Sequence, residues 1–410
     1  MWTWTSKIKT LLFTSGALII AASIMIFPEA ASESSVSGMK TWWNVVFPSL
    51  LPFFIVSELL IGFGVVKILG AIFEPFMRPL FRVPGVGGFV WAMGLASGYP
   101  AGAKLTARLR QEDQLTKIEA ERLAAFTNFS NPLFMFAAVA VGFFHSKELG
   151  LLLAICHYLG NFTVGLVMRF YGHEKNQHYR ENRQRHRVSI RKAFHVLHRE
   201  RMRDDRPLGR LLGDAVHSSI STLLMIGGFI ILFSVINRVL SILHVTDAAS
   251  AILAVILEQI HIPPQLSHAI VTGFFEITLG SQAASQADAL LVFKVVVTSF
   301  ILAFSGFSVQ AQVASILADT DINFKPYFLA RFLHGIFSAG FTLLLWKPLY
   351  LDRLPNSKQG SVKVFDPDFS PVWGQWLWDF LMQYGSVITF AALLVYIAVT
   401  IRSMKNKFPA

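Results

Sequence analysis

A series of apolar stretches, each about twenty residues long and poor in charge, most constrains how this chain can fold, because a helix of that length crosses a bilayer. The stretches are residues 11–27, 44–66, 126–144, 149–171, 217–245, 289–317, 327–347 and 381–401. Backbone groups in lipid must pair within the protein, and segments of this length do so as helices. With 53% hydrophobic and only 15% charged residues, the sequence predicts an all-α polytopic membrane protein with about eight transmembrane helices.

The net charge of +11 is concentrated in one part of the chain. Residues 172–210 are rich in Lys and Arg, which is typical of a cytoplasmic loop and indicates no nucleic-acid partner. The histidines of this loop are irregularly spaced and have no neighbouring cysteine, so a solvated or membrane-surface segment is expected and no metal site. Basic residues near both ends place both termini in the cytoplasm. Residues 11–27 are expected to be an uncleaved anchor, although a cleaved signal peptide has a similar composition.

Residues 97–104, Ser-Gly-Tyr-Pro-Ala-Gly-Ala-Lys, place helix breakers and a lysine within an apolar region. Backbone freed at membrane depth is tolerated only inside protein or beside a watery cavity, and a lysine there often marks a solute path. The preceding apolar segment, 85–98, is too short to span, and residues 104–122 are basic again. The chain is therefore expected to form a re-entrant hairpin with its tip at residues 98–102. A second one is expected within 266–285, broken around residues 280–282.

The two hairpins fall in two halves with three crossings each, and an odd number of crossings forces the halves to be inverted. A shift of 175 residues also superposes Gly-x-Phe-x-x-Gly at 160–165 on the same pattern at 335–340. Inverted repeats with broken helices are typical of transporters with a central solute site. The predicted parts are an anchor helix and outer loop (1–40), a first repeat (41–171), the basic loop (172–210), a second repeat (211–348), and an outer loop with the last helix (349–410).

The first hairpin supplies the leading candidates for solute binding. Its tip would offer free backbone amides and the start of a helix to an anion, through Ser97, Gly98, Tyr99, Pro100 and Gly102. Lys104 and Arg108 are four residues apart and share one helical face, where they are expected to clamp a carboxylate. The alternative is that both side chains reach the cytoplasmic interface as topology anchors.

Polar side chains in the later crossings and in the second hairpin complete the predicted site, and they are Asn128, Ser130, Asn131, Glu276, Thr278, Ser281, Gln282, Ser305, Ser308 and Gln310. Unpaired polar groups are costly in lipid, so these side chains are expected to line a wet site. Hydrogen bonding between helices is the alternative explanation. Glu276 and Glu58 are expected either to exchange a proton during transport or to form structural ion pairs. The spans contain no residue set at catalytic spacing, so neither an enzyme nor a cofactor is predicted.

The motif at 97–104, followed by Leu-Thr-Ala-Arg-Leu and then Phe-Thr-Asn-Phe-Ser-Asn-Pro at 126–132, resembles the YlbJ-type sporulation integral membrane proteins of endospore-forming Firmicutes. The halves resemble the gate, or nucleoside-recognition, domains of concentrative nucleoside transporters. The second half departs from them with Ala303-Phe304-Ser305, so a nucleoside site does not carry over whole. The resemblance implies movement of dipicolinic acid from the mother cell across the outer forespore membrane. A nucleoside or nucleobase transporter and a non-transporting factor in spore-envelope assembly remain as alternatives. The expected partners are the lipid bilayer, the dipicolinate anion, and a second copy or other sporulation membrane proteins.

Overall fold

The computed structural model describes residues 4–172 and 207–353, and every regular element in these ranges is a helix. The chain divides into two units, residues 1–350 and 351–410, and the description below concerns the first unit. Of the second unit only the short helix η5, Leu351–Arg353, is described. Residues 173–206 of the predicted basic loop (172–210) and the predicted last span, 381–401, lie outside the described residues, and residues 208–210 at the end of that loop are already helical.

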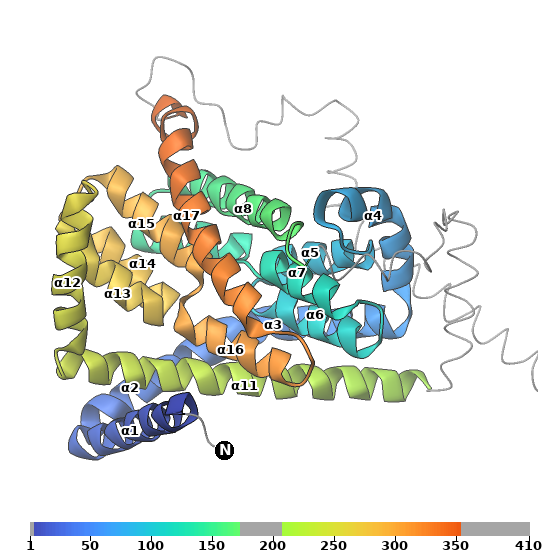
Figure 1. The fold of residues 1–410 in the computed structure, drawn as a ribbon, viewed down its shortest axis with the longest axis horizontal. Helices are drawn as coiled ribbons and strands as arrows, with labels where there is room; N and C mark the ends of the chain where they lie inside the picture. The colour runs from blue at the N-terminus through green and yellow to red at the C-terminus, as the bar shows by residue number, and fades with distance from the viewer. Residues whose placement is uncertain (1–3, 173–206, 354–410) are drawn as a thin grey trace, which may run out of the picture. The chain divides into compact units, whose positions relative to one another are not determined.

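In the described residues, nine helices precede the span α8; Figure 1 labels the α-helices among them. They are α1 (Trp4–Ile26), α2 (Pro28–Thr41), the π-helical turn η1 (Trp42–Val46), α3 (Phe47–Gly62), α4 (Val65–Phe81), α5 (Val86–Ser97), α6 (Ala101–Gln111), α7 (Lys117–Thr127) and the π-helical segment η2 (Phe134–Phe143). The span α8 (Glu148–Met168) follows. The second half comprises α11 (Leu208–Ile242), α12 (Val245–Gln259), η4 (Pro264–Leu266), α13 (Ser267–Phe275), α14 (Ile277–Gln286), α15 (Leu291–Phe304), α16 (Gly306–Ala318) and α17 (Phe324–Leu349).

The all-helical membrane architecture is confirmed, but the described residues contain fewer uninterrupted spans than expected. Four segments are long and apolar enough to cross a membrane, or up to six if each of two bent helix pairs counts as one span. The bends measure 104° between α1 and α2 and 90° between α4 and α5. Other apolar stretches are shorter helices, such as residues 50–62 and 134–143. The prediction counted apolar residues, whereas the helices are interrupted inside several of those stretches.

Residues 28–41, expected as part of an outer loop, form helix α2, which continues through η1 into α3. Pro28 begins the helix, where its missing N–H costs no hydrogen bond. This helix packs closely on α11, since a Cβ at Gly38 would lie 2.8 Å from Ser234 Oγ. Further along, Trp42 Nε1 donates to the Leu223 carbonyl at 2.8 Å. In Figure 1, α11 lies along one side of the bundle.

The first hairpin has the predicted tip. Helix α5 ends at Ser97, Gly98 adopts φ 82°, and α6 begins after a cis Tyr99–Pro100 peptide bond. Residues 128–131 then separate α7 from η2, and Asn131 Oδ1 caps η2 by accepting from the Phe134 N–H at 2.8 Å.

The second hairpin turns earlier than predicted. Helices α13 and α14 meet at Glu276, and residues 280–282 lie inside α14, so the expected break there is wrong. Gly280 instead lets the two arms cross closely, because a Cβ there would lie 2.6 Å from the Gly273 nitrogen. A second helix break follows at Ser305, between α15 and α16, where φ is 73°. The order of elements from α13 to α17 thus matches the order from α5 to α8.

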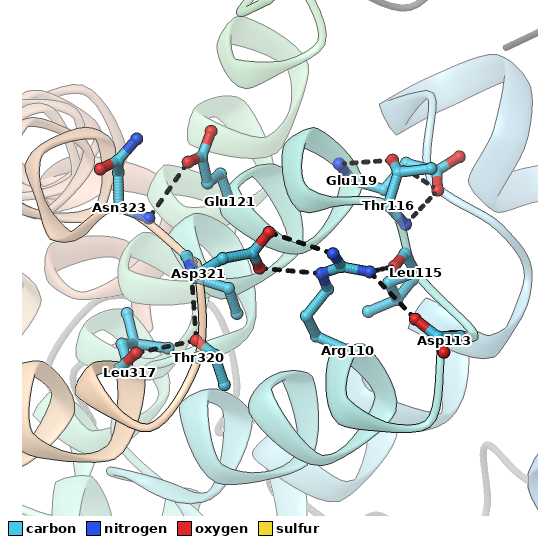
Figure 2. A network of polar contacts seen from close by, with 11 residues as sticks. Arg110, Asp113, Leu115, Thr116, Glu119, Glu121, Leu317, Thr320, Asp321 and Asn323 are labelled. Carbon is cyan, nitrogen blue, oxygen red and sulfur yellow. Dashed lines mark hydrogen bonds and ion pairs between the residues drawn. The ribbon is translucent and has the colours of Figure 1, made fainter.

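The loop between α16 and α17 contacts the end of the first hairpin (Figure 2). Arg110 on α6 donates through Nε and Nη2 to the two carboxylate oxygens of Asp321, at 2.9 and 3.0 Å. Glu121 on α7 accepts from the Asn323 N–H at 3.1 Å. Asp321 of this loop therefore faces the basic end of α6. The Arg110 hydrogen bonds hold the pKa of Asp321 below its usual value.

Candidate functional site

A cavity of about 1000 Å³ lies between the two hairpins, and it is also lined by residues of the first helix break and of the helix that follows the second break. Helices α2, α3, α11, α12, α13, α14 and α16 also contribute to its wall. Nine of the predicted site residues line it, and they are Ser97, Gly98, Tyr99, Ser130, Asn131, Glu276, Thr278, Gln282 and Ser308. Residues nearly 180 positions apart in sequence, such as Gly98 and Glu276, thus share one space.

The other predicted residues do not line the cavity, and they are Pro100, Gly102, Lys104, Arg108, Asn128, Ser281, Ser305 and Gln310. Several of them hold the hairpins and breaks in place. Asn128 Oδ1 accepts from the Ala103 N–H at 3.3 Å, and its Nδ2 donates to the Tyr327 hydroxyl at 3.1 Å. Gln310 Nε2 donates to the Phe304 carbonyl at the second break, at 3.0 Å. Ser281 and Ser305 are fully buried.

Lys104 and Arg108 face a protein carboxylate. Lys104 Nζ lies 3.4 Å from Glu58 Oε1, and Arg108 Nε lies 3.9 Å from Glu58 Oε2. Lys104 also lies over the Phe54 ring, 4.6 Å from its centroid. The two cations do sit on one face of α6, as predicted, but Glu58 of α3 occupies the position that was expected for a solute anion.

The polar groups of the first hairpin tip are largely hydrogen-bonded to neighbouring elements. Asn131 Nδ2 donates to the Ser97 carbonyl at 3.0 Å, and the Tyr99 hydroxyl donates to the Leu302 carbonyl at 2.9 Å. Ser97 Oγ differs, because it is buried and has no hydrogen-bond partner among the described residues.

Three ionisable side chains line the cavity, namely Arg238, His268 and Glu276. Glu276 caps α14 by accepting from the Leu279 N–H at 2.8 Å. Its carboxylate thus already occupies a helix N-terminus of the kind that attracts anions. Arg238 of α11 is exposed, lines the cavity, and forms no hydrogen bond or ion pair within the described part of the chain. An arginine within the apolar stretch 217–245 was a signal that the sequence analysis passed over.

A fully buried arginine on α17 holds the first helix break. Arg331 donates to the carbonyls of Ala125 and Asn128, and to Asn161 Oδ1 at 3.3 Å. The carbonyls at the end of α7 have lost their helical partners because the helix stops at Thr127. Arg331 supplies the missing donors at the negative end of the helix dipole. It thereby fixes the backbone that presents Ser130 and Asn131 to the cavity.

Two buried histidines extend this network. The Ser130 N–H donates to His157 Nε2 at 3.0 Å, so the proton of this ring lies on Nδ1. Arg331 Nη1 lies 3.1 Å from His334 Nδ1, and His334 Nε2 lies 2.8 Å from the His157 carbonyl. The arginine always donates, so His334 accepts through Nδ1 and donates through Nε2. Both rings are therefore neutral. A second proton would have to bind the accepting nitrogen, which in each ring already faces a hydrogen-bond donor. The charged Arg331 in the apolar stretch 327–347 was the sequence signal for this network.

The all-helical fold, its broken apolar helices and its central cavity define a polytopic integral membrane protein with a gate domain. Residues 43–147, which span most of α3 to η2 and include the first hairpin, match the Gate family model, described as nucleoside recognition. The chain is also 55% identical over 394 residues to the "Sporulation integral membrane protein YlbJ" of Bacillus subtilis (strain 168), covering 96% of each chain. It therefore belongs to the YlbJ family of sporulation integral membrane proteins. No solved structure matches it.

Proposed function

We propose that this protein is a transporter that carries a small organic anion, dipicolinic acid, across the outer forespore membrane from the mother cell. The observation that carries the proposal is that two hairpins, the first helix break and the helix after the second break line one cavity of about 1000 Å³. Broken helices at membrane depth cost hydrogen bonds and are retained where they line a solute site. The cavity volume is at the upper end of the range for small-molecule sites.

The groups in the cavity suit a planar anion better than Lys104 does. Dipicolinate is a rigid aromatic dianion and needs a cation, hydrogen-bond donors and a flat wall. Arg238 offers the cation together with its N–H donors, and Tyr99 and Phe134 lie in the wall. Membership of a sporulation membrane family supports a solute that moves during spore formation.

The repeated order of elements supports two inverted repeats, which we assign to residues 41–171 and 211–348. Each contains a hairpin, a broken helix and a long span, namely α5 to α8 and α13 to α17. In such architectures the solute site lies between the repeats near the membrane midplane, where one repeat moves against the other. This accounts for residues of both halves in one cavity without any enzymatic step.

A nucleoside or nucleobase is the second candidate solute. The match of residues 43–147 to a model described as nucleoside recognition favours it. The same cavity has the volume for such a molecule, and Glu276, Gln282 and Ser308 offer hydrogen-bond groups to an uncharged solute.

Uptake by the purified protein in liposomes separates these solutes. We expect radiolabelled dipicolinate to be taken up and uridine or adenosine to be excluded; the reverse result would establish the second candidate. Arg238→Gln should raise the dipicolinate KM about tenfold or more, because a charge-assisted hydrogen bond contributes about 1.5–3 kcal/mol. Arg210→Gln is the matched control, since Arg210 is an exposed cation on the same helix outside the cavity. Absence of uptake for every tested solute would refute a transport function.

A further inference from the structure

The charged cluster at Glu58 lies on the path from the cavity to one face of the protein. Along α3, the cavity-lining Leu50 and Glu58 are eight residues apart, and along α11 Ile226 and Ser218 are eight residues apart in the opposite direction. Eight residues of helix extend about 12 Å. The cluster therefore lies about two turns below the cavity on both helices.

An apolar layer separates the cavity from this cluster. It consists of Trp42, Leu50, Phe54, Ala101, Leu223 and Ile226, which form one buried group. Leu223 is fully buried and Phe54 and Ala101 are 1% exposed. These side chains come from α3, α6 and α11, so the layer closes when the first hairpin is against the α3–α11 pair.

The ion pairs join the same three elements. Glu58 Oε1 lies 3.4 Å from Lys104 Nζ and accepts from Ser218 Oγ at 2.9 Å. Lys104 Nζ in turn donates to the Ser218 carbonyl at 3.4 Å. Glu58 and Lys104 are about one-tenth exposed, whereas Arg108, one turn further along α6, is 41% exposed. The order from the inside outward is cavity, apolar layer, buried ion pair and exposed arginine, and α6 then reaches the face where Arg110 binds Asp321.

We propose that Glu58 and Lys104 form an ion-pair gate that closes the cavity toward the face carrying Arg110 and Asp321, while Arg108 pairs with Glu112 of its own helix at 3.1 Å. The gate opens when the arm α6 moves away from α3 and α11, which separates Lys104 from both Glu58 and the Ser218 carbonyl. A buried ion pair suits this task, because it is stable only in one geometry and leaves a costly unpaired charge in any partial opening. The gate rests on the proposed transport function for its purpose, but its position can be tested without any solute.

Cysteine accessibility tests the gate directly. The chain contains a single cysteine, Cys156, so Cys156→Ser gives a background without thiols. Gln282→Cys then places one exposed thiol in the cavity wall. Membrane vesicles of both orientations are treated with a charged, impermeant maleimide. We expect labelling from one side only. Lys104→Met or Glu58→Gln should raise the labelling rate from the other side about tenfold or more. This factor corresponds to a free energy between those typical of breaking an exposed and a buried ion pair.

Two further variants keep the test decisive. Glu58→Gln combined with Lys104→Met removes both partners and leaves no unpaired charge between them, so this protein should fold even if a single variant does not, and it should still label from both sides. Asp321→Asn breaks an ion pair on the same face outside the path and should leave labelling one-sided. The gate is refuted if the folded double variant labels from one side only, or if the background protein already labels from both. Dipicolinate uptake that fails while the labelling pattern holds would count against the proposed function alone.

Discussion

Gly102 provides the sharpest test of how the first hairpin is built, because the structure gives this glycine a steric role. A Cβ at Gly102 would lie 2.5 Å from the Thr127 carbonyl carbon and 2.9 Å from the Thr127 hydroxyl, and it would overlap the carbonyl oxygen. Ordinary carbon contacts are about 3.5–4.0 Å long. Gly102→Ala therefore requires α6 and the end of α7 to separate by about 1 Å.

Both sides of this contact are helix backbone, so no side-chain rotation relieves it. Inserting a methyl group into a well-packed site costs about 1–3 kcal/mol, and a backbone contact places Gly102→Ala at the upper end of that range. Alanine returns up to about 1 kcal/mol through its helix propensity, which leaves a net destabilisation of about 2 kcal/mol. The assay is thermal unfolding of the detergent-solubilised protein, where Gly102→Ala should lower Tm by several degrees.

Gly228→Ala is the matched control. Gly228 also lies within a helix, α11, but nothing lies within 4 Å of an added Cβ there. This substitution should raise stability by up to about 1 kcal/mol, so the two Gly→Ala changes have opposite signs. A Gly102→Ala protein as stable as the parent would show that α6 does not pack on the Thr127 carbonyl, and the steric account of the hairpin would be refuted.

Three other substitutions test separate contacts by the same Tm assay. The pKa of Asp321 is lowered by the hydrogen bonds from Arg110, so the stabilising effect is present above the ordinary Asp pKa of about 3.9 and is lost as the pH falls through the lowered folded-state value. Asp321→Asn should thus reduce stability at pH 7 by about 1 kcal/mol or less, and this difference should vanish once the pH has fallen below the lowered folded-state pKa of Asp321. Arg331→Lys should cost about 2–3 kcal/mol, because one ammonium group cannot reach all the acceptors that the planar guanidinium serves. Trp42→Phe removes the indole hydrogen bond to α11 and should cost about 1 kcal/mol, whereas Trp43→Phe should be nearly neutral because Trp43 is exposed.

Each of these has an opposing outcome. If the effect of Asp321→Asn on Tm did not depend on pH, the stabilising effect of Asp321 would not come from its charge. Full stability of Arg331→Lys would show that the end of α7 needs no guanidinium. Equal effects of the two tryptophan substitutions would remove the case for the indole hydrogen bond.

The tip of the first hairpin was predictable because its chemistry is local. Gly98 and Pro100 stand together, and neither residue continues a helix readily, so the chain ends α5 at Ser97 whatever packs around it. The basic end of the following arm was equally visible in the sequence.

The turn of the second hairpin was predicted at the wrong residues, because a glycine can either break a helix or allow two helices to pack closely. The sequence predicts a helix break at Gly280. This glycine instead lies inside α14 and allows α14 to pack closely on Gly273 of α13. A break and a close helix crossing both favour glycine, and local sequence does not distinguish them. Glu276, the residue at the actual turn, looked like a solute ligand and also serves as the cap of α14.

The role of Lys104 depended on a partner far away in sequence. The sequence places Lys104 and Arg108 on one face of α6 and Glu58 in an apolar span. No local pattern indicates that Lys104 and Glu58 form an ion pair. Arg331 and Arg238 were not predicted as functional residues. Each is a single arginine within an apolar stretch, and such a residue at membrane depth is itself a signal of a polar environment.

The sequence by itself determined that the chain is a helical membrane protein, where the first hairpin turns, and which polar segments interrupt its apolar helices, because composition and backbone preference act over short distances. The tertiary structure decided which cation meets which acceptor. Glu58, Lys104 and Ser218 come from three helices, and Arg331 binds carbonyls about 200 residues away. In a medium of low polarity a buried charge is stable only beside a partner, and that partner is set by how the helices pack.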